Sequence, residues 1–265
     1  MSLGAFEWKF ARAEAAAVRR LADRFGDAAR SRASLTGLRD LVADAASELG
    51  FAYFALLHHA SLSSPCTSLL RIDNYPPEWA AELAADDLAL HDPVHLASRR
   101  TNKGFIWSAL GALVRLGREQ KLILKRSRKF GLGPGVTVPV NVPGEPAGSC
   151  SFAMRSGEEL PVDRLLCAEL VGAHAFSAAR RLAGFPRDVE RPHLSRRELQ
   201  CLRLVAIGKT DWEIGRILGI STETARQYVK SARAAYGVVS RTQLVVLGLR
   251  DDWLSFEEAA PGRLS

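Results

Sequence analysis

The apolar positions of the first fifty residues recur with the period of an α-helix. Residues 6–25 are rich in alanine and carry five apolar anchors at this spacing, namely Phe6, Phe10, Val18, Leu21 and Phe25. We expect Gly26 to end this helix, because glycine readily adopts the left-handed conformation found just past helix ends. A second series follows Ser34, a residue type that caps helices, and it runs to Leu49 before Gly50.

Between residues 51 and 184, short apolar runs alternate with longer helical patterns. The short runs predict strands over 51–57, 67–75, 135–142 and 148–155. The longer patterns predict helices over 78–100 with a break at Asp92-Pro93, over 108–130 up to Gly131, Gly133 and Gly135, and over 161–184. Helices, then mostly strands, then helices again predict an α/β/α sandwich over residues 30–184.

Three capping boxes follow residues 184–193, a proline-containing stretch with mixed charges that is typical of a linker. In each box a Ser or Thr side chain and a Glu or Gln three residues later satisfy each other's backbone N–H groups. The pairs are Ser195 with Glu198, Thr210 with Glu213, and Ser240 with Gln243. They predict four short helices over 194–252, with a tail at 253–265. The chain is therefore an α+β protein with a first domain over 1–183.

The third of these short helices begins at Ser221, two residues after Gly219, and so tight a joint predicts a helix-turn-helix. Its apolar positions, Ala225, Val229, Ala232 and Tyr236, are expected to face the core. Five polar residues are then expected to point outward, namely Thr224, Arg226, Gln227, Lys230 and Arg233. Arg and Lys can read guanine edges in the major groove, and Gln can read adenine. The alternative is a helix face that is merely exposed to solvent, because such a face has the same composition. The short neighbouring helices and the tight turn favour DNA binding.

The distribution of charge points to the same segment. Residues 191–250 hold eleven lysines and arginines against four aspartates and glutamates, an excess equal to the net charge of +7 of the whole chain. The remainder of the chain is therefore close to neutral. A short segment that carries the whole positive excess indicates a polyanionic partner for that segment. The alternative is that these charges only make the surface soluble.

Several protein classes are disfavoured by the sequence. It shows neither a secretory signal nor an apolar stretch of about 18 residues, so we expect a cytoplasmic protein without a membrane partner. The four cysteines show no C-x-x-C spacing and are interpreted as free thiols. His91 and His95 are four residues apart, but Pro93 separates them and no Glu accompanies them, so neither a metal nor a cofactor is expected.

Residues 194–245 resemble the helix-turn-helix of LuxR-type regulators. The matching residues include Arg197-Glu198, Gly208-Lys209-Thr210, Glu213-Ile214, Ile220-Ser221, Gly237-Val238 and Ser240-Arg241. The resemblance places base-reading positions on Arg226 and Lys230, phosphate contacts on Lys209, Arg233 and Arg241, and a dimer contact on residues 240–249. The chain departs from the usual Val, His and Asn of this helix at Ala225, Tyr228 and Ser231.

Residues 34–180 resemble the autoinducer-binding domain of LuxR-type quorum-sensing receptors. The resemblance rests on Asn74-Tyr75-Pro76, Trp79, Asp92-Pro93-Val94, Trp107, Gly148 and Ser151. It implies a ligand-binding function and argues against the phosphorylated receiver domains that carry the same output domain. Leu83 stands where the family commonly has an aromatic residue.

The residue types suit an N-acyl homoserine lactone, which has an amide N–H, two carbonyls and an apolar tail. Asp92 can accept the amide N–H, Trp79 can donate to the lactone carbonyl, and Tyr75 or Ser151 can donate to the acyl carbonyl. Trp107 can pack on the lactone ring. Strand alternation from Tyr75 also places Arg71 and Asp73 on the pocket face, so Arg71 is expected to line the pocket and pair with Asp73 or meet a polar ligand group.

Each of these residues also has a plain structural interpretation. Asp-Pro is a common helix start, both tryptophans suit a core, and Tyr75 suits a turn. Only their joint spacing favours a binding site. We therefore expect a quorum-sensing transcriptional regulator that binds the small-molecule autoinducer and, as a homodimer, a palindromic element of double-stranded DNA. RNA polymerase is a further candidate partner.

Two alternatives remain. The first alternative is a receptor for a different small molecule. The second is an acyl-transfer enzyme with its active site at Cys150 or Cys167. The enzyme is disfavoured because neither cysteine has a base and an orienting acid nearby in the sequence.

Overall fold

The computed structural model of the protein describes residues 12–59, 69–85, 88–143, 145–185 and 191–260. The chain divides into two compact units, Met1–Arg187 and Asp188–Ser265. Of the positions named above, Phe6, Phe10, the first residues of the 67–75 segment and the middle of the 184–193 segment lie outside the described residues, as does Cys66, one of the four cysteines.

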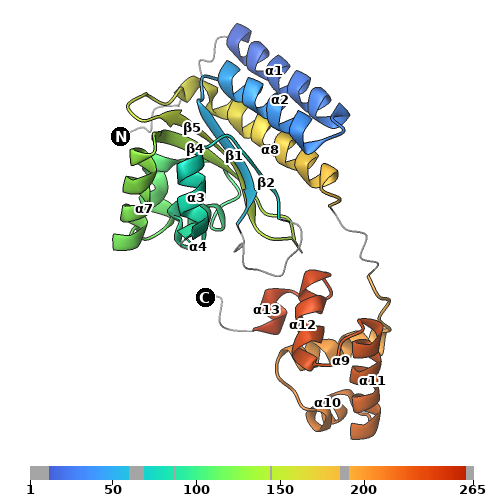
Figure 1. The fold of residues 1–265 in the computed structure, drawn as a ribbon. Helices are drawn as coiled ribbons and strands as arrows, with labels where there is room; N and C mark the ends of the chain where they lie inside the picture. The colour runs from blue at the N-terminus through green and yellow to red at the C-terminus, as the bar shows by residue number, and fades with distance from the viewer. Residues whose placement is uncertain (1–11, 60–68, 86–87, 144, 186–190, 261–265) are drawn as a thin grey trace, which may run out of the picture. The chain divides into compact units, whose positions relative to one another are not determined.

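An antiparallel sheet of five strands organises the first unit (Figure 1). Its strands are β1 (Tyr53–His58), β2 (Arg71–Asp73), β3 (Phe105–Ile106), β4 (Leu132–Val140) and β5 (Gly148–Arg155). They lie in the order β2-β1-β5-β4-β3, so β5 is central and β2 is an edge strand. The four predicted strands are present, and among the described residues the two-residue β3 is the one strand that was not predicted.

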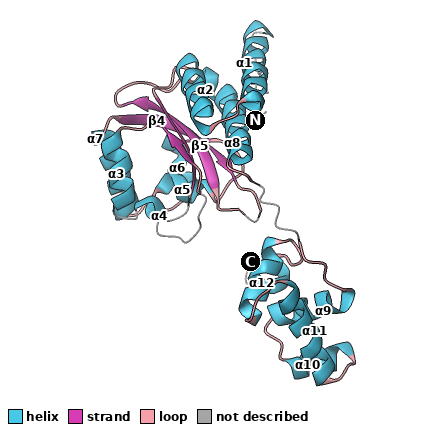
Figure 2. Cartoon of the chain, turned by 45° about the vertical axis from the view of Figure 1, so that its right-hand side comes forward, coloured by secondary structure: helices cyan, strands magenta, loops and turns pink. Residues whose placement is uncertain are grey.

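Helices cover both faces of this sheet, which confirms the predicted α/β/α sandwich (Figures 1 and 2). One face packs on α2 (Leu35–Glu48) and α8 (Leu165–Leu182), which follows the 3-10 turn η2 (Val162–Arg164), and α1 (Arg12–Ser31) packs on α8 and α2. The helical elements of the other face are α3 (Pro77–Ala85), α4 (Leu88–His91), α5 (Pro93–Ser98), η1 (Trp107–Ala109), α6 (Leu110–Leu113) and α7 (Arg118–Lys129).

Strand alternation decides which side chains face which layer. On β1, Phe54 and Leu56 are fully buried in the main core against α2 and α8, together with Phe152 and Phe176. Because successive side chains of a strand point to opposite faces, Ala55 and Leu57 point toward α3, α5 and α7. The α1-α2-α8 layer thus holds the main core, and the opposite layer encloses the space in which the predicted ligand residues lie.

Gly26 does not end the first helix, contrary to the prediction. Helix α1 continues through Gly26 to Ser31. A Cβ atom at Gly26 would lie 3.3 Å from the His174 ring of α8, so the missing side chain serves close packing between the two helices. The glycine at this position is therefore explained by the tertiary contact with His174, and no left-handed turn interrupts the helix.

The helix predicted over 108–130 is interrupted. Val114 is extended at φ −140 and ψ 150, which ends α6, and α7 starts only after Gly117. The interruption lets Leu110, Leu113 and Val114 pack into a small core with Phe105. Strand β4 also starts earlier than predicted, at Leu132, with a register shift between Leu132 and Gly135.

The second unit contains five described helices, α9 (Arg196–Ala206), α10 (Asp211–Leu218), α11 (Thr222–Ala235), α12 (Arg241–Arg250) and α13 (Phe256–Ala259). All three predicted capping boxes form. Gly208 and Gly219 have positive φ, as their positions at helix ends require.

Residues 253–260, which the sequence sets apart as a tail, belong to this unit. Leu254 is only 4% exposed and packs with Leu202 and Leu244. Helix α13 carries Glu258, whose carboxylate lies 3.3 Å from Nε of Arg203 on α9. The apolar contacts of Leu254 therefore extend the core of the unit beyond the predicted boundary.

Candidate functional site

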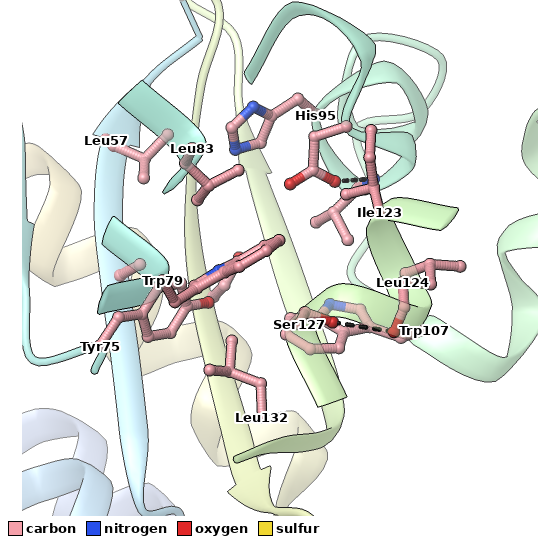
Figure 3. Close-up of a pocket in the computed structure, with 14 residues that line it drawn as sticks. Leu57, Tyr75, Trp79, Leu83, His95, Trp107, Ile123, Leu124, Ser127 and Leu132 are labelled. Carbon is pink, nitrogen blue, oxygen red and sulfur yellow. Dashed lines mark hydrogen bonds between the residues drawn. The ribbon is translucent and has the colours of Figure 1, made fainter. Parts of the chain in front are cut away.

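A pocket lies on the sheet face that packs on α3, α5 and α7 (Figure 3). Five of the six predicted ligand residues line it, namely Tyr75, Trp79, Asp92, Trp107 and Ser151. Its other walls are mostly apolar and include Ala55, Leu57, Leu83, Val94, Ile123, Leu124 and Leu132. Tyr75, Trp79, Asp92 and Trp107 come from separate segments between residues 75 and 107, and Ser151 comes from the central strand, so the fold brings them together.

Asp92 has two roles in this pocket. It is the N-cap of α5, with its Oδ1 accepting a hydrogen bond of 2.8 Å from the Val94 N–H, and Pro93 occupies the first helical position. Asp92 is also only 8% exposed and lines the pocket. Asp92 can therefore cap α5 and also contact a ligand, because its carboxylate has two oxygens and the cap uses Oδ1.

A chain of hydroxyl groups connects one wall of the pocket to the other. Trp107 donates from Nε1 to Thr137 Oγ1 over 2.8 Å, and Thr137 Oγ1 lies 2.9 Å from Ser151 Oγ. Ser151 lines the pocket together with Tyr75. Because the indole can only donate, Thr137 accepts from Trp107, and either hydroxyl can donate in the bond between Thr137 and Ser151. The Trp107 N–H is therefore occupied, and what the residue offers a ligand is its ring.

Thr137 was not among the predicted site residues. Its signal is a single hydroxyl in the otherwise apolar run over 135–140, at a position paired across the sheet with Ser151. The pairing of Thr137 with Ser151 follows from the register of β4 and β5, which the sequence alone does not specify. Burial raises the pKa of Tyr75, so its hydroxyl stays protonated and able to donate.

His95 lines the pocket but was not predicted as a ligand residue. It stacks on His59 with ring centroids 4.2 Å apart. His59 Nε2 lies 2.8 Å from Ser149 Oγ, and His59 Nδ1 lies 3.1 Å from Ser98 Oγ. Burial lowers the pKa of His59 well below 6.5, and the neighbouring His95 and Arg99 lower it further, so this ring is neutral at pH 7.

Arg71 is the predicted ligand residue that the pocket does not include. It pairs across the sheet with Leu57, so it does lie on the expected face. However, β2 is the edge strand, and the side chain is 37% exposed, with Nε donating to Asp73 Oδ2 over 2.9 Å. The expectation of a buried, pocket-lining arginine is wrong, whereas the expected pairing with Asp73 is present.

Helices α10 and α11 form the predicted helix-turn-helix. Ser221 caps α11 by accepting from the Thr224 N–H, and Ala225, Val229 and Ala232 are buried as predicted. The expected outward residues Thr224, Arg226, Gln227 and Lys230 are exposed. This face therefore presents long donors from one helix, the arrangement that suits a major groove.

Arg226 and Lys209 are each held by carboxylates on the same surface. Arg226 donates from Nη1 to Glu223 over 2.6 Å, and its Nε lies 3.7 Å from Asp211 Oδ2. Lys209 Nζ lies 3.2 Å from Glu213. These exposed pairs contribute little energy, so phosphates or base edges can replace them.

Two of the predicted phosphate contacts make hydrogen bonds within the unit. Arg233 is half-buried and donates to the Val239 carbonyl, so it does not point outward as expected. Arg241 donates over 2.8 Å to Asp211 and over 2.9 Å to the Lys209 carbonyl, which ties the start of α12 to the start of α10. In this arrangement both guanidinium groups join elements of the unit to one another.

The structure also describes Cys150 and Cys167, potential metal ligands and the apolarity of the helices. Cys150 and Cys167 are fully buried and burial raises the pKa of each, which disfavours a reactive thiolate. In the part of the chain that the structure describes, no three potential metal ligands come together. Within the same ranges, no helix combines the length and the apolarity needed to cross a membrane.

The fold and the pocket together define a class of protein, a ligand-binding sensor joined to a helix-turn-helix. Two family comparisons agree. The autoinducer binding domain matches residues 34–182, and the luxR family of bacterial regulatory proteins matches residues 192–247. The chain belongs to the LuxR family of autoinducer-binding transcriptional regulators.

Individual proteins show the same similarity. The chain is 29% identical over 190 residues to the HTH-type transcriptional regulator y4qH of Sinorhizobium fredii, covering 69% of this chain but only 56% of y4qH. It is 25% identical to the transcriptional activator TraR of Agrobacterium vitis, over 80% of this chain and 90% of TraR. The crystal structure of Escherichia coli SdiA is 23% identical, covers 90% of this chain and 98% of its own, and has a TM-score of 0.60. These relatives are named as regulators, so the acyl-transfer alternative has no support.

Proposed function

We propose that the first unit binds an N-acyl homoserine lactone and that the second binds a palindromic promoter element as part of a dimer. The observation that carries the ligand proposal is the convergence of Tyr75, Trp79, Asp92, Trp107 and Ser151 on one pocket. In this proposal Asp92 accepts the amide N–H and Trp79 donates to the lactone carbonyl. Tyr75 or Ser151 donates to the acyl carbonyl, and the Trp107 ring packs on the lactone.

The hydroxyl chain supports these roles. With the Trp107 N–H donated to Thr137, the indole is fixed in orientation and offers its ring face. Thr137 in turn lies 2.9 Å from Ser151 Oγ, which holds the Ser151 hydroxyl beside the pocket, and hydroxyls of this kind can donate to a ligand oxygen. A carbonyl oxygen is the ligand group that such donors recognise, and an acyl amide supplies one.

The size of the pocket supports a linkage mechanism. Its cavity is about 30 Å³, room for only about two water molecules, so a ligand must displace side chains and become part of the core. A ligand that binds only the folded unit stabilises it, by about 2.7 kcal/mol at a hundred times its Kd. Ligand binding thereby raises the amount of folded, dimer-competent protein.

The dimer proposal rests on α12, the helix to which the family resemblance assigns dimer contact. Leu244 and Gly248 face the core of their own unit, but Val246 is 57% exposed. A second copy that packs its own α12 there would cover this residue and present two copies of α11 to two half-sites. RNA polymerase is proposed as a further partner of the DNA-bound dimer.

Titration of the purified full-length chain with N-octanoyl homoserine lactone tests the ligand proposal. We expect saturable binding and a rise in melting temperature. No binding of this compound or of shorter and longer acyl analogues would exclude the proposed class of ligand.

The second candidate function is a receptor for a different small molecule. It is favoured by His95 and Leu83, which line the pocket but have no role in the proposed contacts with an acyl lactone. SdiA has a solved structure in complex with octanoyl-rac-glycerol, an acyl compound of another class. A mass spectrum of organic extracts from the purified protein distinguishes the candidates, since it identifies the co-purifying ligand directly.

A further inference from the structure

A second cavity adjoins the ligand pocket at the Trp107 end. The two cavities share Trp107, Leu124 and Ser127, which lie together at one side of the pocket in Figure 3. The second cavity is about 290 Å³, roughly ten times the volume of the pocket itself. Its remaining walls are Ser108, Arg128, Gly133, Pro134, Ser156 and Gly157. We call this cavity the Arg128 groove.

The Trp107 ring forms the wall between the pocket and the groove, and the backbone holds it there. The ring lies so close to β4 that a Cβ atom on Gly135 would come within 2.8 Å of its Cε2. The hydrogen bond to Thr137 fixes the Nε1 edge. A ligand ring packed on Trp107 therefore lies next to the groove, with Leu124 and Ser127 of α7 as the other boundary.

The chemistry of the groove differs from that of the pocket. It has three hydroxyl side chains, Ser108, Ser127 and Ser156, and the Arg128 guanidinium, and none of its lining residues is acidic. Arg128 makes no ion pair among the described residues, whereas Arg126, two positions earlier on α7, lies 3.0 Å from Glu82. Hydroxyl groups and an unpaired guanidinium without a nearby carboxylate favour an anionic ligand group, such as a carboxylate.

The volumes also favour a ligand that uses both cavities. Small-molecule sites usually measure about 300–1,000 Å³, far more than the pocket alone. Together the pocket and the groove reach the lower end of that range. A ligand with its amide at Asp92 and its ring or head group at Trp107 has space for polar substituents on the groove side.

We propose that the Arg128 groove binds the carboxylate of an N-acyl amino acid, so that the protein recognises the ring-opened form of an acyl homoserine lactone as well as the lactone. This inference rests on the proposed function, because that proposal places the lactone ring on Trp107. Ring opening adds one water molecule and converts the ester into a carboxylate and a hydroxyl. Arg128 binds the carboxylate, and the neighbouring serines accept from or donate to the hydroxyl.

The experiment compares two probes that differ only by this hydrolysis, N-octanoyl homoserine lactone and N-octanoyl homoserine. Each is titrated calorimetrically into the full-length wild type, Arg128→Gln and Lys129→Gln. Lys129 is exposed on the same helix and does not line the groove, so it controls for the loss of one positive charge. We expect wild type to bind both probes. Arg128→Gln should weaken only the open form, on the order of fivefold as for other exposed ion pairs, and Lys129→Gln should weaken neither.

The outcomes separate this inference from the proposed function. Binding of the lactone without binding of the open form overturns the inference and leaves the proposed function intact. A loss in Arg128→Gln that is equal for both probes, absent, or matched by Lys129→Gln also overturns it. If wild type binds neither probe, the proposed function fails and the inference fails with it.

Discussion

The two roles of Asp92 can be separated by substitution. Asp92→Asn keeps an oxygen that can accept from the Val94 N–H and cap α5, and asparagine is as good an N-cap as aspartate. It removes the negative charge from the side chain that faces the pocket. We therefore expect a nearly unchanged free energy of unfolding and a weakened affinity for N-octanoyl homoserine lactone.

The size of the effect follows from the type of hydrogen bond. Asp92 is only 8% exposed, so a charged bond to a ligand amide is poorly screened by water. Hydrogen bonds to charged groups contribute about 1.5–3 kcal/mol. The Kd of Asp92→Asn should thus rise by roughly tenfold to a hundredfold, at about 1.4 kcal/mol per factor of ten.

Two further variants complete the measurement. Asp92→Ala should lose the ligand bond and also the cap, with about 1 kcal/mol less stability. Ser34→Ala removes an equivalent cap, the 3.1 Å bond from the Gly37 N–H at the start of α2, on the opposite layer of the sandwich. It should lower the free energy of unfolding by a similar amount without changing the Kd.

Calorimetric titration gives the Kd of each variant, and urea denaturation gives its free energy of unfolding. If Asp92→Asn binds the lactone as tightly as wild type, the carboxylate is only a helix cap and the proposed ligand contact is wrong. If Ser34→Ala weakens binding as much as Asp92→Ala does, the loss of affinity reflects reduced stability and not a lost contact.

Three other measurements test separate parts of the structure. Arg226→Ala should cost about 1–3 kcal/mol on the cognate DNA site and relax specificity, whereas Lys209→Ala should weaken all sequences alike and reduce the salt slope by about one; equal losses on cognate and scrambled duplexes would assign Arg226 to phosphate contact. Because the folded-state pKa of His59 lies well below 6.5, the unfolded chain takes up this proton first, and stability should fall as pH decreases from about 6.5. A free energy of unfolding that stays constant from about pH 7.5 to about pH 5 would contradict this assignment. Leu254→Ala should destabilise the second unit by about 2–5 kcal/mol, and a truncated chain ending at residue 252 that melts at the wild-type temperature would show that residues 253–260 are dispensable.

The predictions that rested on paired residues within one helical turn agree with the structure. The capping boxes at Ser195, Thr210 and Ser240 form because both partners lie within one helical turn. The turn at Gly219 follows from a left-handed residue and its own neighbours. The residues matched to the autoinducer-binding family converge on one pocket, since their spacing was itself evidence of a shared fold.

The misplaced residues depend on contacts across the fold. Gly26 looked like a helix end because its packing partner, His174, lies 148 positions further along the chain. Arg71 was placed on the correct face of its strand, but only the strand order shows that this strand is an edge exposed to solvent. Arg233 followed the outward pattern of α11, yet the loop before α12 supplies a carbonyl that holds it against the unit.

The sequence by itself therefore determined where most helices and strands lie, which side of each strand is apolar, and which residues could recognise a ligand or DNA. Those properties arise from interactions between residues a few positions apart, or from a spacing shared with a family. The tertiary structure alone decided that Thr137 links Trp107 to Ser151, and that the cavity beside Trp107 continues toward Arg128. Both depend on strand register and layer packing, which join residues that are distant in the chain.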